Sequence, residues 1–427
     1  MSATAWTLLV TFAGGMLLGA PVAVVLGLAA IFGLLVADYP LIVFAQRLVA
    51  GTQVFTLLAI PGFILMGELM MRGGLSRRLV NVGDVLVRHI TGGLGMVTVV
   101  SATFFAAISG SAPATTAAIG GIMIPEMERR GWQRRFSAAL ATASGPIGQM
   151  IPPSIPMIIW GVVSEDSITK LFLAGIIPGL LIAIGLIGVS YVHARRNGIL
   201  REANRATGRE IRRALWDAKW SLLAPFVILG GIYGGVFTPT EASAIGVVYA
   251  LIVGFFVHRE LKLADLGTIL HRSIRTTTIV CFIIATASAF GWLVAFEQLP
   301  ATIANAMLSI SDNWIVILLL INLMLLIIGA LMDNIAAMII LGAILTTIAD
   351  KIGIDPIQFG AMVVINLAIG MATPPFGYSL FIGSAISDVS IEKITVSIWP
   401  MILVMVFVLM LVAFVPPLTL LLPSLFG

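Results

Sequence analysis

The sequence predicts an all-α polytopic membrane protein made of two inverted-topology repeats, and three observations support this. Hydrophobic residues make up 59% of the 427 residues and charged residues only 10%, whereas a soluble domain has roughly 25% charged residues. A helix-breaking motif with two consecutive prolines occurs twice in the chain. Basic residues gather in a few of the connections between apolar segments, where they determine the orientation of a membrane protein.

The repeated motif runs from Gly148 to Pro153 and again from Gly370 to Pro375, 222 positions later. Each copy is followed at the same offset by a glycine and then by a proline: Gly161 and Gly383, Pro178 and Pro400. One such motif alone is open to interpretation as an ordinary kink, but two copies with the same surroundings indicate an internal repeat. Paired interrupted helices in the two halves of a chain are typical of the binding sites of secondary transporters.

The charged connections predict the topology. The positive-inside rule places the arginine-rich connections on the cytoplasmic side, and these are residues 72–88, 129–135, 195–219 and 259–275. The other connections are poor in Lys and Arg, and several carry the acids Asp38, Glu165, Asp166, Glu241, Glu297, Asp312, Asp350 and Asp355. We therefore expect this second group on the outer side of the membrane.

Two apolar segments are predicted to be re-entrant hairpins. Segment 92–125 lies between two cytoplasmic clusters and is shorter than the roughly 40 residues that two spans need, so we expect a hairpin with its tip at residues 109–113. Segment 314–349 lies between acidic connections, so we expect a hairpin that enters from the opposite side, with its tip near 329–334. The length of this segment alone does not exclude two short, tilted spans.

The remaining apolar segments predict about ten transmembrane helices, two of them discontinuous. They are residues 4–19, 21–37, 54–71, 137–163 (broken), 168–193, 219–237, 240–257, 275–296, 357–386 (broken) and 393–423. Because each half is predicted to cross the membrane an odd number of times, the second half has the opposite orientation in the membrane. We expect a first repeat over residues 1–200, a cytoplasmic linker over 201–218 and a second repeat over 219–427.

The breaks predict a binding site. Irregular backbone survives in a membrane only inside protein or beside a wet cavity, and Pro153 and Pro375 each remove a backbone donor. Free carbonyl groups there suit an alkali cation, and helix N-termini suit an anionic substrate. The hairpin tips add polar side chains: Ser109, Ser111, Thr115 and Thr116 in the first half, Asp333 and Asn334 in the second, with Thr373 on the broken segment. We predict an anion site between the halves, near Ser109, Ser154 and Asp333.

Several of these residues also have structural interpretations. The serines of the first tip are small enough to serve only in helix packing. Asp333 is the strongest functional candidate, because a carboxylate at the centre of a membrane helix costs about 2.5–3.5 kcal/mol on insertion scales. For Glu68, a structural and a functional role are equally open. Glu241 follows Thr238 in a pattern that favours capping of a helix N-terminus.

Soluble enzymes and nucleic-acid-binding proteins are not favoured. The four histidines lack metal-ligand spacing, no phosphate-binding loop is present, and Cys281 is the single cysteine, which excludes a disulfide framework. The net charge of +4 comes from loops beside apolar segments and does not indicate a nucleic-acid partner. Without a nucleotide site, any active transport must use an ion gradient.

Four motifs resemble the large membrane subunit of tripartite ATP-independent periplasmic (TRAP) transporters. They are Gly230 to Ala242 (GGIYGGVFTPTEA), Ser109 to Thr115 (SGSAPAT), Ile151 to Pro156 (IPPSIP) and Thr373 to Gly377 (TPPFG). The resemblance implies a protein of the bacterial inner membrane that imports an organic acid, such as a C4-dicarboxylate or sialic acid, with sodium and by an elevator mechanism. It also implies two partners, a periplasmic substrate-binding protein and a small four-helix membrane subunit, which is expected as a separate chain.

The resemblance also implies two sodium clusters. One comprises Ser109, Ser111, Gly145, Gly148 and Pro152, and the other comprises Gly329, Asp333, Asn334, Gly370 and Thr373. The alternative is a stand-alone sodium-coupled carboxylate or ion exchanger of the same architecture, which needs no binding protein. A passive channel is a third hypothesis. A membrane enzyme is the weakest, because no nucleophile or metal cluster is predicted to face the core.

Overall fold

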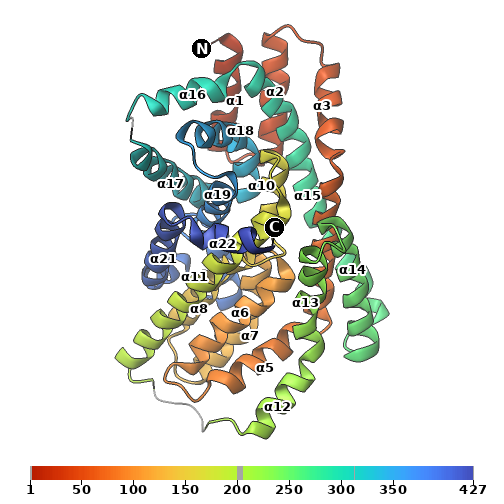
Figure 1. Ribbon diagram of the computed structural model, residues 1–427, viewed down its shortest axis with the longest axis vertical. Helices are drawn as coiled ribbons and strands as arrows, with labels where there is room; N and C mark the ends of the chain where they lie inside the picture. The colour runs from red at the N-terminus through yellow and green to blue at the C-terminus, as the bar shows by residue number, and fades with distance from the viewer. Residues whose placement is uncertain (1, 200–204, 312, 427) are drawn as a thin grey trace.

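The computed structural model describes residues 2–199, 205–311 and 313–426, and these residues fold into helices joined by short connections (Figure 1). Some predicted positions lie outside these ranges: Asp312, the first four residues of the 201–218 linker, and the ends of the two repeats at 200 and 427. The elements are α1 (Ala3–Leu17), α2 (Val22–Val36), α3 (Ile42–Thr52), η1 (Phe55–Leu58), α4 (Ala59–Arg72), α5 (Leu75–Val87), α6 (Gly93–Ser109), α7 (Ala112–Arg129), α8 (Arg134–Ser144), α9 (Ile147–Met150), α10 (Ile155–Ser164), α11 (Ile168–Arg196), α12 (Gly208–Asp217), α13 (Lys219–Tyr233), α14 (Pro239–Ile252), η2 (Val253–Val257), α15 (Leu263–Phe296), α16 (Leu299–Leu308), α17 (Trp314–Leu331), α18 (Asn334–Ile352), α19 (Pro356–Gly370), α20 (Tyr378–Ser387), α21 (Ile391–Phe414) and α22 (Pro417–Phe426).

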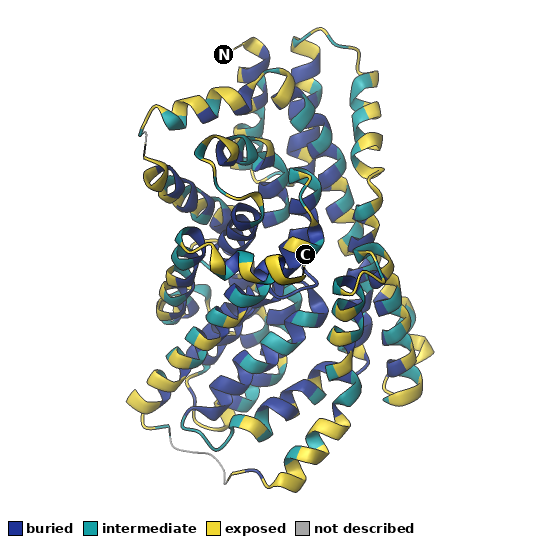
Figure 2. Ribbon diagram, viewed as in Figure 1, coloured by how far each residue is buried: buried dark blue, intermediate teal, exposed yellow. Residues whose placement is uncertain are grey.

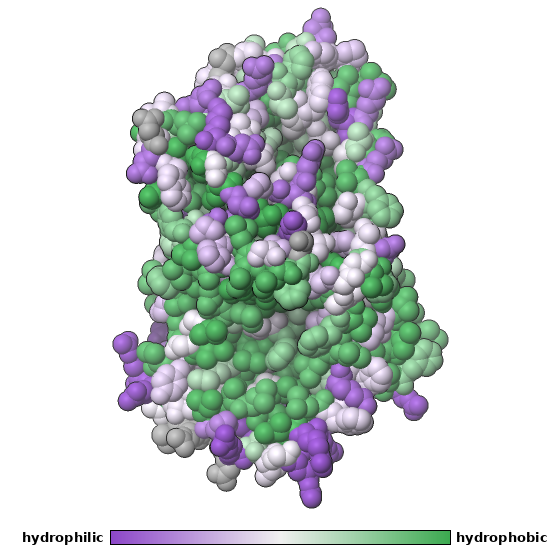
Figure 3. Space-filling view, viewed as in Figure 1, coloured by the Kyte–Doolittle hydropathy of each residue, from purple (hydrophilic) through white to green (hydrophobic). Residues whose placement is uncertain are grey.

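The prediction of an all-helical polytopic membrane protein is confirmed. Among the described residues, 7 helical segments are long and apolar enough to cross a membrane, or up to 9 if each of two bent pairs forms one span. Apolar residues cover a broad middle band of the molecule, and hydrophilic residues gather toward both ends of the view (Figure 3). The helices α1 and α2 have 15 residues each, which is shorter than the roughly 20 residues of a full span.

Two predicted spans have wrong boundaries. The segment 393–423 is not one helix: α21 ends at Phe414 and α22 begins at Pro417, because Pro416 disfavours helical backbone at the residue before it. The segment 275–296 is the end of the longer helix α15, which begins at Leu263. The charged residues at its start hide this extension from a hydropathy search.

Four shorter helices were not predicted: α3, α5, α12 and α16. Both α5 and α12 carry many charged residues among their apolar ones, and a search for continuous apolar spans does not detect them. Helix α5 packs against α6, and α12 packs against α5. They therefore form a layer beside the start of the first hairpin.

The first hairpin consists of α6 and α7, and its turn at Gly110 and Ser111 lies within the predicted tip. Arg88 precedes the hairpin and Arg130 follows it, and both act electrostatically on the Asp84 carboxylate. The two ends of the hairpin are therefore close to each other, as expected of a segment that enters and leaves by one side.

The second hairpin consists of α17 and α18, with its turn at Met332 and Asp333. Each helix is long enough to span a membrane, so length does not decide between a hairpin and two spans. Lys351, at the end of α18, donates a hydrogen bond of 2.5 Å to Asn305, which lies shortly before α17. Both ends of this hairpin therefore lie on the same side of the molecule.

The two broken segments meet at the centre of the molecule, where most residues are buried (Figure 2). The first consists of α8, α9 and α10 and bends by 44°, and the second consists of α19 and α20. Gln149 Nε2 lies 3.4 Å from Met371 Sδ, and these residues are 222 positions apart, the same separation as the two copies of the Pro-Pro motif. Equivalent residues of two repeats meet only where they lie close to a pseudo-two-fold axis, and this contact fits the two-repeat arrangement, which stays a prediction.

Cysteine labelling tests the predicted topology. We expect cysteines at Arg77 and Arg129, both exposed, to react with an impermeant reagent only from the cytoplasmic side of oriented vesicles, because they flank the first hairpin. A cysteine at Asp350 should react only from the opposite side. Each variant is made with Cys281 replaced by serine. Labelling of positions 77 and 129 from opposite sides would contradict the hairpin.

Candidate functional site

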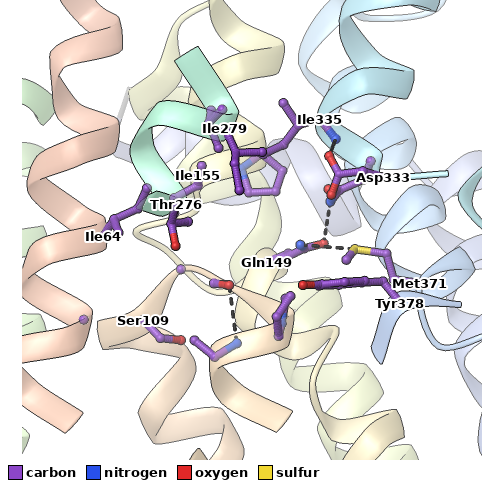
Figure 4. A pocket seen from close by; sticks show the side chains of 18 of the residues that line it. Ile64, Ser109, Gln149, Ile155, Thr276, Ile279, Asp333, Ile335, Met371 and Tyr378 are labelled. Carbon is purple, nitrogen blue, oxygen red and sulfur yellow. Dashed lines mark hydrogen bonds between the residues drawn. The ribbon is translucent and has the colours of Figure 1, made fainter. Parts of the chain in front are cut away.

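Both hairpin tips reach one cavity of about 550 Å³ near the centre of the molecule (Figure 4). Helices α4 and α15 line one side of it, through residues such as Ile64 and Ile279. The hairpins and the broken segments line the other side, where Asp333 and Met371 lie. The polar residues of the lining are Glu68, Ser109, Ser111, Gln149, Thr276, Asp333, Asn334 and Tyr378.

The first tip is attached to the break of its own half. Gly110 has a φ of 61°, a left-handed conformation that glycine adopts without strain. The Gly110 carbonyl accepts a hydrogen bond of 3.3 Å from the backbone N–H of Ile155, just after the Pro-Pro pair. The Ser111 hydroxyl caps the start of α7. The first tip therefore contacts the break of its own half, next to the residues of the first cluster that the resemblance implies.

Oxygen atoms surround the glycines of the first break. A methyl group placed on Gly148 would lie 2.4 Å from Thr115 Oγ1 and 2.7 Å from the Ser111 carbonyl oxygen. A methyl group on Gly145 would lie 2.1 Å from Thr116 Oγ1, and this buried hydroxyl has no hydrogen-bond partner among the described residues. Buried polar atoms are nearly always paired, so an unpaired hydroxyl among carbonyl oxygens fits a site for a hard cation.

The second tip is built around a helix cap. Asp333 Oδ1 accepts hydrogen bonds from the backbone N–H groups of Ile335 (2.9 Å) and Ala336 (3.4 Å) at the start of α18. Behind the tip, a methyl group on Gly370 would lie 2.6 Å from Gly329 Cα, so this hairpin also touches the break of its own half. Asp333 thus combines a capping role with a position on the cavity wall.

A side-chain bridge joins the two halves. Asn334 Nδ2 donates a hydrogen bond of 2.8 Å to Gln149 Oε1, and both side chains are buried. Sequence reasoning did not select Gln149, although its place inside the Pro-Pro motif was a usable signal. The bridge couples the second tip to the first break.

The cavity wall is acidic. Among its described lining residues, Glu68 and Asp333 are the only charged ones. One buried carboxylate oxygen of Glu68 accepts no hydrogen bond within the part of the chain that the structure covers, while Arg272 and Arg72 act on this carboxylate electrostatically. The helix N-termini of α7 and α18 also reach the wall at Ser111 and Asp333, and such ends carry partial positive charge. The cavity therefore attracts cations through its carboxylates, whereas an anion finds helix N-termini and neutral hydroxyl and amide donors.

The predicted site residues separate into two groups. Ser109, Ser111, Asp333 and Asn334 line the cavity. The others are not among the residues that line it: Gly145, Gly148, Pro152, Ser154, Gly329, Gly370 and Thr373. The Ser154 hydroxyl donates to the Gln149 carbonyl oxygen at 2.6 Å and caps α10. Ser154 does not line the cavity, so its role in substrate binding stays a prediction. Thr276 and Tyr378 were not predicted, because no sequence motif marks them.

The interpretation of Glu241 as a cap is confirmed. The Thr238 side chain accepts from the Glu241 backbone N–H at 3.3 Å, and the Glu241 carboxylate accepts from the Thr238 N–H at 2.8 Å. This reciprocal pair is a capping box at the start of α14, and Glu241 does not line the cavity.

Loss of the bridge should destabilise the protein. We expect Asn334→Ala to lower the free energy of unfolding by about 1–3 kcal/mol, because the Gln149 side-chain oxygen would be left buried without a donor. Thermal unfolding of the purified protein measures this. The double variant Gln149→Ala/Asn334→Ala should lose less than the sum of the two single variants, and strictly additive losses would show that the two side chains are not coupled.

Comparison with known proteins identifies the family. The sequence model described as "Tripartite ATP-independent periplasmic transporter, DctM component" matches residues 9–418. The chain belongs to this family. It is therefore one component of a tripartite transporter of the bacterial inner membrane, and it is a large permease and not an enzyme.

Individual relatives agree with this assignment. The chain is 43% identical to the isethionate TRAP transporter permease protein DctMQ of Oleidesulfovibrio alaskensis, over 95% of this chain and 64% of that protein. It is 42% identical to the sialic acid TRAP transporter large permease protein SiaM of Vibrio cholerae, over 90% of this chain and 89% of that protein. The fold also resembles the Alcanivorax borkumensis YdaH transporter, with a TM-score of 0.63 at 14% identity and coverage of 88% of each chain.

Proposed function

We propose that this TRAP permease imports an organic acid anion together with sodium, and that a periplasmic binding protein delivers the anion. Membership of the family supports the reaction class. The observation that carries the ion coupling is the acidic cavity wall: Glu68 and Asp333 are its only charged residues among those described. A carboxylate substrate meets no basic side chain there, so bound cations must offset the repulsion between like charges.

The oxygen atoms around Gly145 and Gly148 support one cation site, where these glycines meet the first tip. The second site lies where the second tip meets Gly370, and there the support is the Asp333 carboxylate of the tip, because the atoms that face Gly370 are carbon and nitrogen. Unwound backbone in discontinuous helices commonly coordinates sodium. The ions would then lie beside the helix N-termini that face the anion, so that the ion sites and the anion site form and empty together.

The position of the cavity supports an elevator mechanism. Its two sides belong to different helices, with α4 and α15 on one side and the hairpins and broken segments on the other. The hairpins and broken segments would move as one body against α4 and α15, carrying the anion across. The partners in this function are the periplasmic binding protein and a small four-helix membrane subunit.

Uptake into vesicles tests the proposal. The chain is reconstituted with the small subunit, a sodium gradient is imposed, and uptake of labelled isethionate, sialic acid and a C4-dicarboxylate is measured with and without the binding protein. We expect accumulation of one of these classes that requires both sodium and the binding protein. Uptake without the binding protein would favour the stand-alone exchanger, and uptake without a sodium gradient would favour a channel.

A further inference from the structure

Helix α12 lies outside the transport site and exposes most of its surface (Figures 1 and 2). It belongs to the linker between the two halves, and it begins with a capping box between Thr207 and Glu210. A break bends the chain by 55° between α12 and α13. Helix α13 is apolar, so α12 is placed where the polar linker meets a membrane-embedded helix.

One side of α12 is already occupied. Glu210 forms an ion pair of 3.1 Å with Arg88, which follows α5, and Asp217 pairs with Arg213 at 4.0 Å. Ala214 and Asp217 share a cleft with Asp84 of α5. Both acidic residues of the helix are therefore turned toward this inner side.

The opposite side carries a basic strip, which we define as Arg209, Arg212, Trp216 and Lys219. The spacing of three and four residues places Arg209, Arg212 and Trp216 along one side of α12, and Lys219, at the start of α13, joins them through its contact with Trp216. The Lys219 ammonium lies 3.6 Å from the centre of the Trp216 ring, and the Trp216 side chain is 68% exposed. Arg209 and Arg212 are exposed, and neither forms an ion pair with an acid that the structure describes. The strip contains no acidic side chain.

This combination has the chemistry of a lipid headgroup site. Tryptophan prefers the boundary between apolar and polar layers of a membrane, and the positive-inside rule places this linker on the cytoplasmic side. The lipids of the cytoplasmic leaflet are negatively charged and attract Lys and Arg near the surface. Hydrophilic residues gather at the end of the molecule where α12 lies (Figure 3).

We propose that the basic strip binds the headgroup of an anionic phospholipid in the cytoplasmic leaflet. The two guanidinium groups hold the phosphate, and the Trp216 ring lies at the level of the glycerol backbone. The lipid anchors α12 and, through the Arg88–Glu210 ion pair, the α5 layer beside the first hairpin. This inference does not depend on the substrate or on the coupling ion.

Native mass spectrometry of the full chain tests the proposal with phosphatidylglycerol and phosphatidylcholine as probes. We expect Arg209→Gln/Arg212→Gln to weaken phosphatidylglycerol binding by roughly tenfold, because both guanidinium groups are proposed to contact the phosphate directly and bonds between charged groups are the strong ones. The matched control is Arg195→Gln/Arg196→Gln, which removes two exposed charges from the end of α11 and should change binding less than twofold. Arg209→Lys/Arg212→Lys should retain most of the binding.

Three outcomes would overturn the proposal. The first is an equal loss of phosphatidylglycerol binding in the two glutamine variants. The second is equal binding of phosphatidylcholine and phosphatidylglycerol by the unaltered chain. The third is loss of the small subunit from the Arg209→Gln/Arg212→Gln variant without a change in lipid binding. The last result would assign the strip to a protein interface. Thermal unfolding of each variant confirms that it is folded before binding is compared.

Discussion

Replacing Asp333 with asparagine is expected to lower sodium affinity by roughly 10- to 100-fold and to reduce uptake accordingly at a fixed sodium concentration. A hydrogen bond or contact that involves a charged group contributes about 1.5–3 kcal/mol, and 1.4 kcal/mol corresponds to a tenfold change in affinity. Asparagine caps helices as well as aspartate does. The substitution therefore removes the negative charge from the cavity wall while keeping the hydrogen bonds to Ile335 and Ala336.

The matched control for this experiment is Asp355→Asn. Asp355 caps α19 with the same geometry, accepting from Ile357 (2.9 Å) and Gln358 (3.1 Å), but it does not line the cavity. Sodium-dependent uptake should be unchanged in this variant. The measurement is the initial rate of uptake as a function of sodium concentration. An unaltered sodium dependence in Asp333→Asn would remove Asp333 from the ion site.

Asp333→Ala separates the two roles of this residue. It removes both the charge and the cap, so uptake should fall at least as far as in Asp333→Asn, and the protein should also lose about 1 kcal/mol of stability. If the alanine variant alone were inactive, the cap and not the charge would explain the effect.

The sequence predicted those parts of the site that depend on backbone. The Pro-Pro motifs marked both breaks, and each tip contacts the break of its own half, as Gly110 does with Ile155 and Gly329 with Gly370. Such positions are readable because proline and glycine restrict the backbone in a known way. The Gln149–Asn334 bridge was not predicted, because a hydrogen bond between side chains that are distant in sequence leaves no local pattern.

The difference between local patterns and long-range contacts also explains which helices the sequence did not predict. Apolar runs predicted most spans, since the membrane imposes their composition. Helices α5 and α12 were missed because their charges face a neighbouring helix or the polar surface, as the Arg88–Glu210 pair does. Thr276, on the cavity wall opposite the tips, was missed because it is the first of three consecutive threonines after Arg275, and nothing local marks which of the three lines the cavity.

The contact between Gly329 and Gly370 leads to the second large expected effect. We expect Gly370→Ala to reduce sodium-driven uptake by at least about tenfold and to destabilise the protein by about 1–3 kcal/mol, the usual range for overpacking. The added methyl group would lie 2.6 Å from Gly329 Cα and 2.7 Å from its carbonyl carbon. These are backbone atoms, so the second hairpin must move away from the broken segment as a unit, and the oxygen atoms proposed to hold sodium must separate.

Two other glycines provide the controls for Gly370→Ala. At Gly121, on the first hairpin, an added methyl group would meet nothing within 4 Å, so Gly121→Ala should keep full uptake and gain slightly in stability from its higher helix propensity. At Gly329 the nearest contact would be 3.0 Å, to the Leu367 carbonyl oxygen, so Gly329→Ala should fall between the other two variants. Uptake rates and thermal unfolding of the three variants establish this order. The methyl group at position 370 cannot fit without separating the hairpin from the break. If Gly370→Ala nevertheless transported as well as Gly121→Ala, close contact between the two would not be needed for ion coupling.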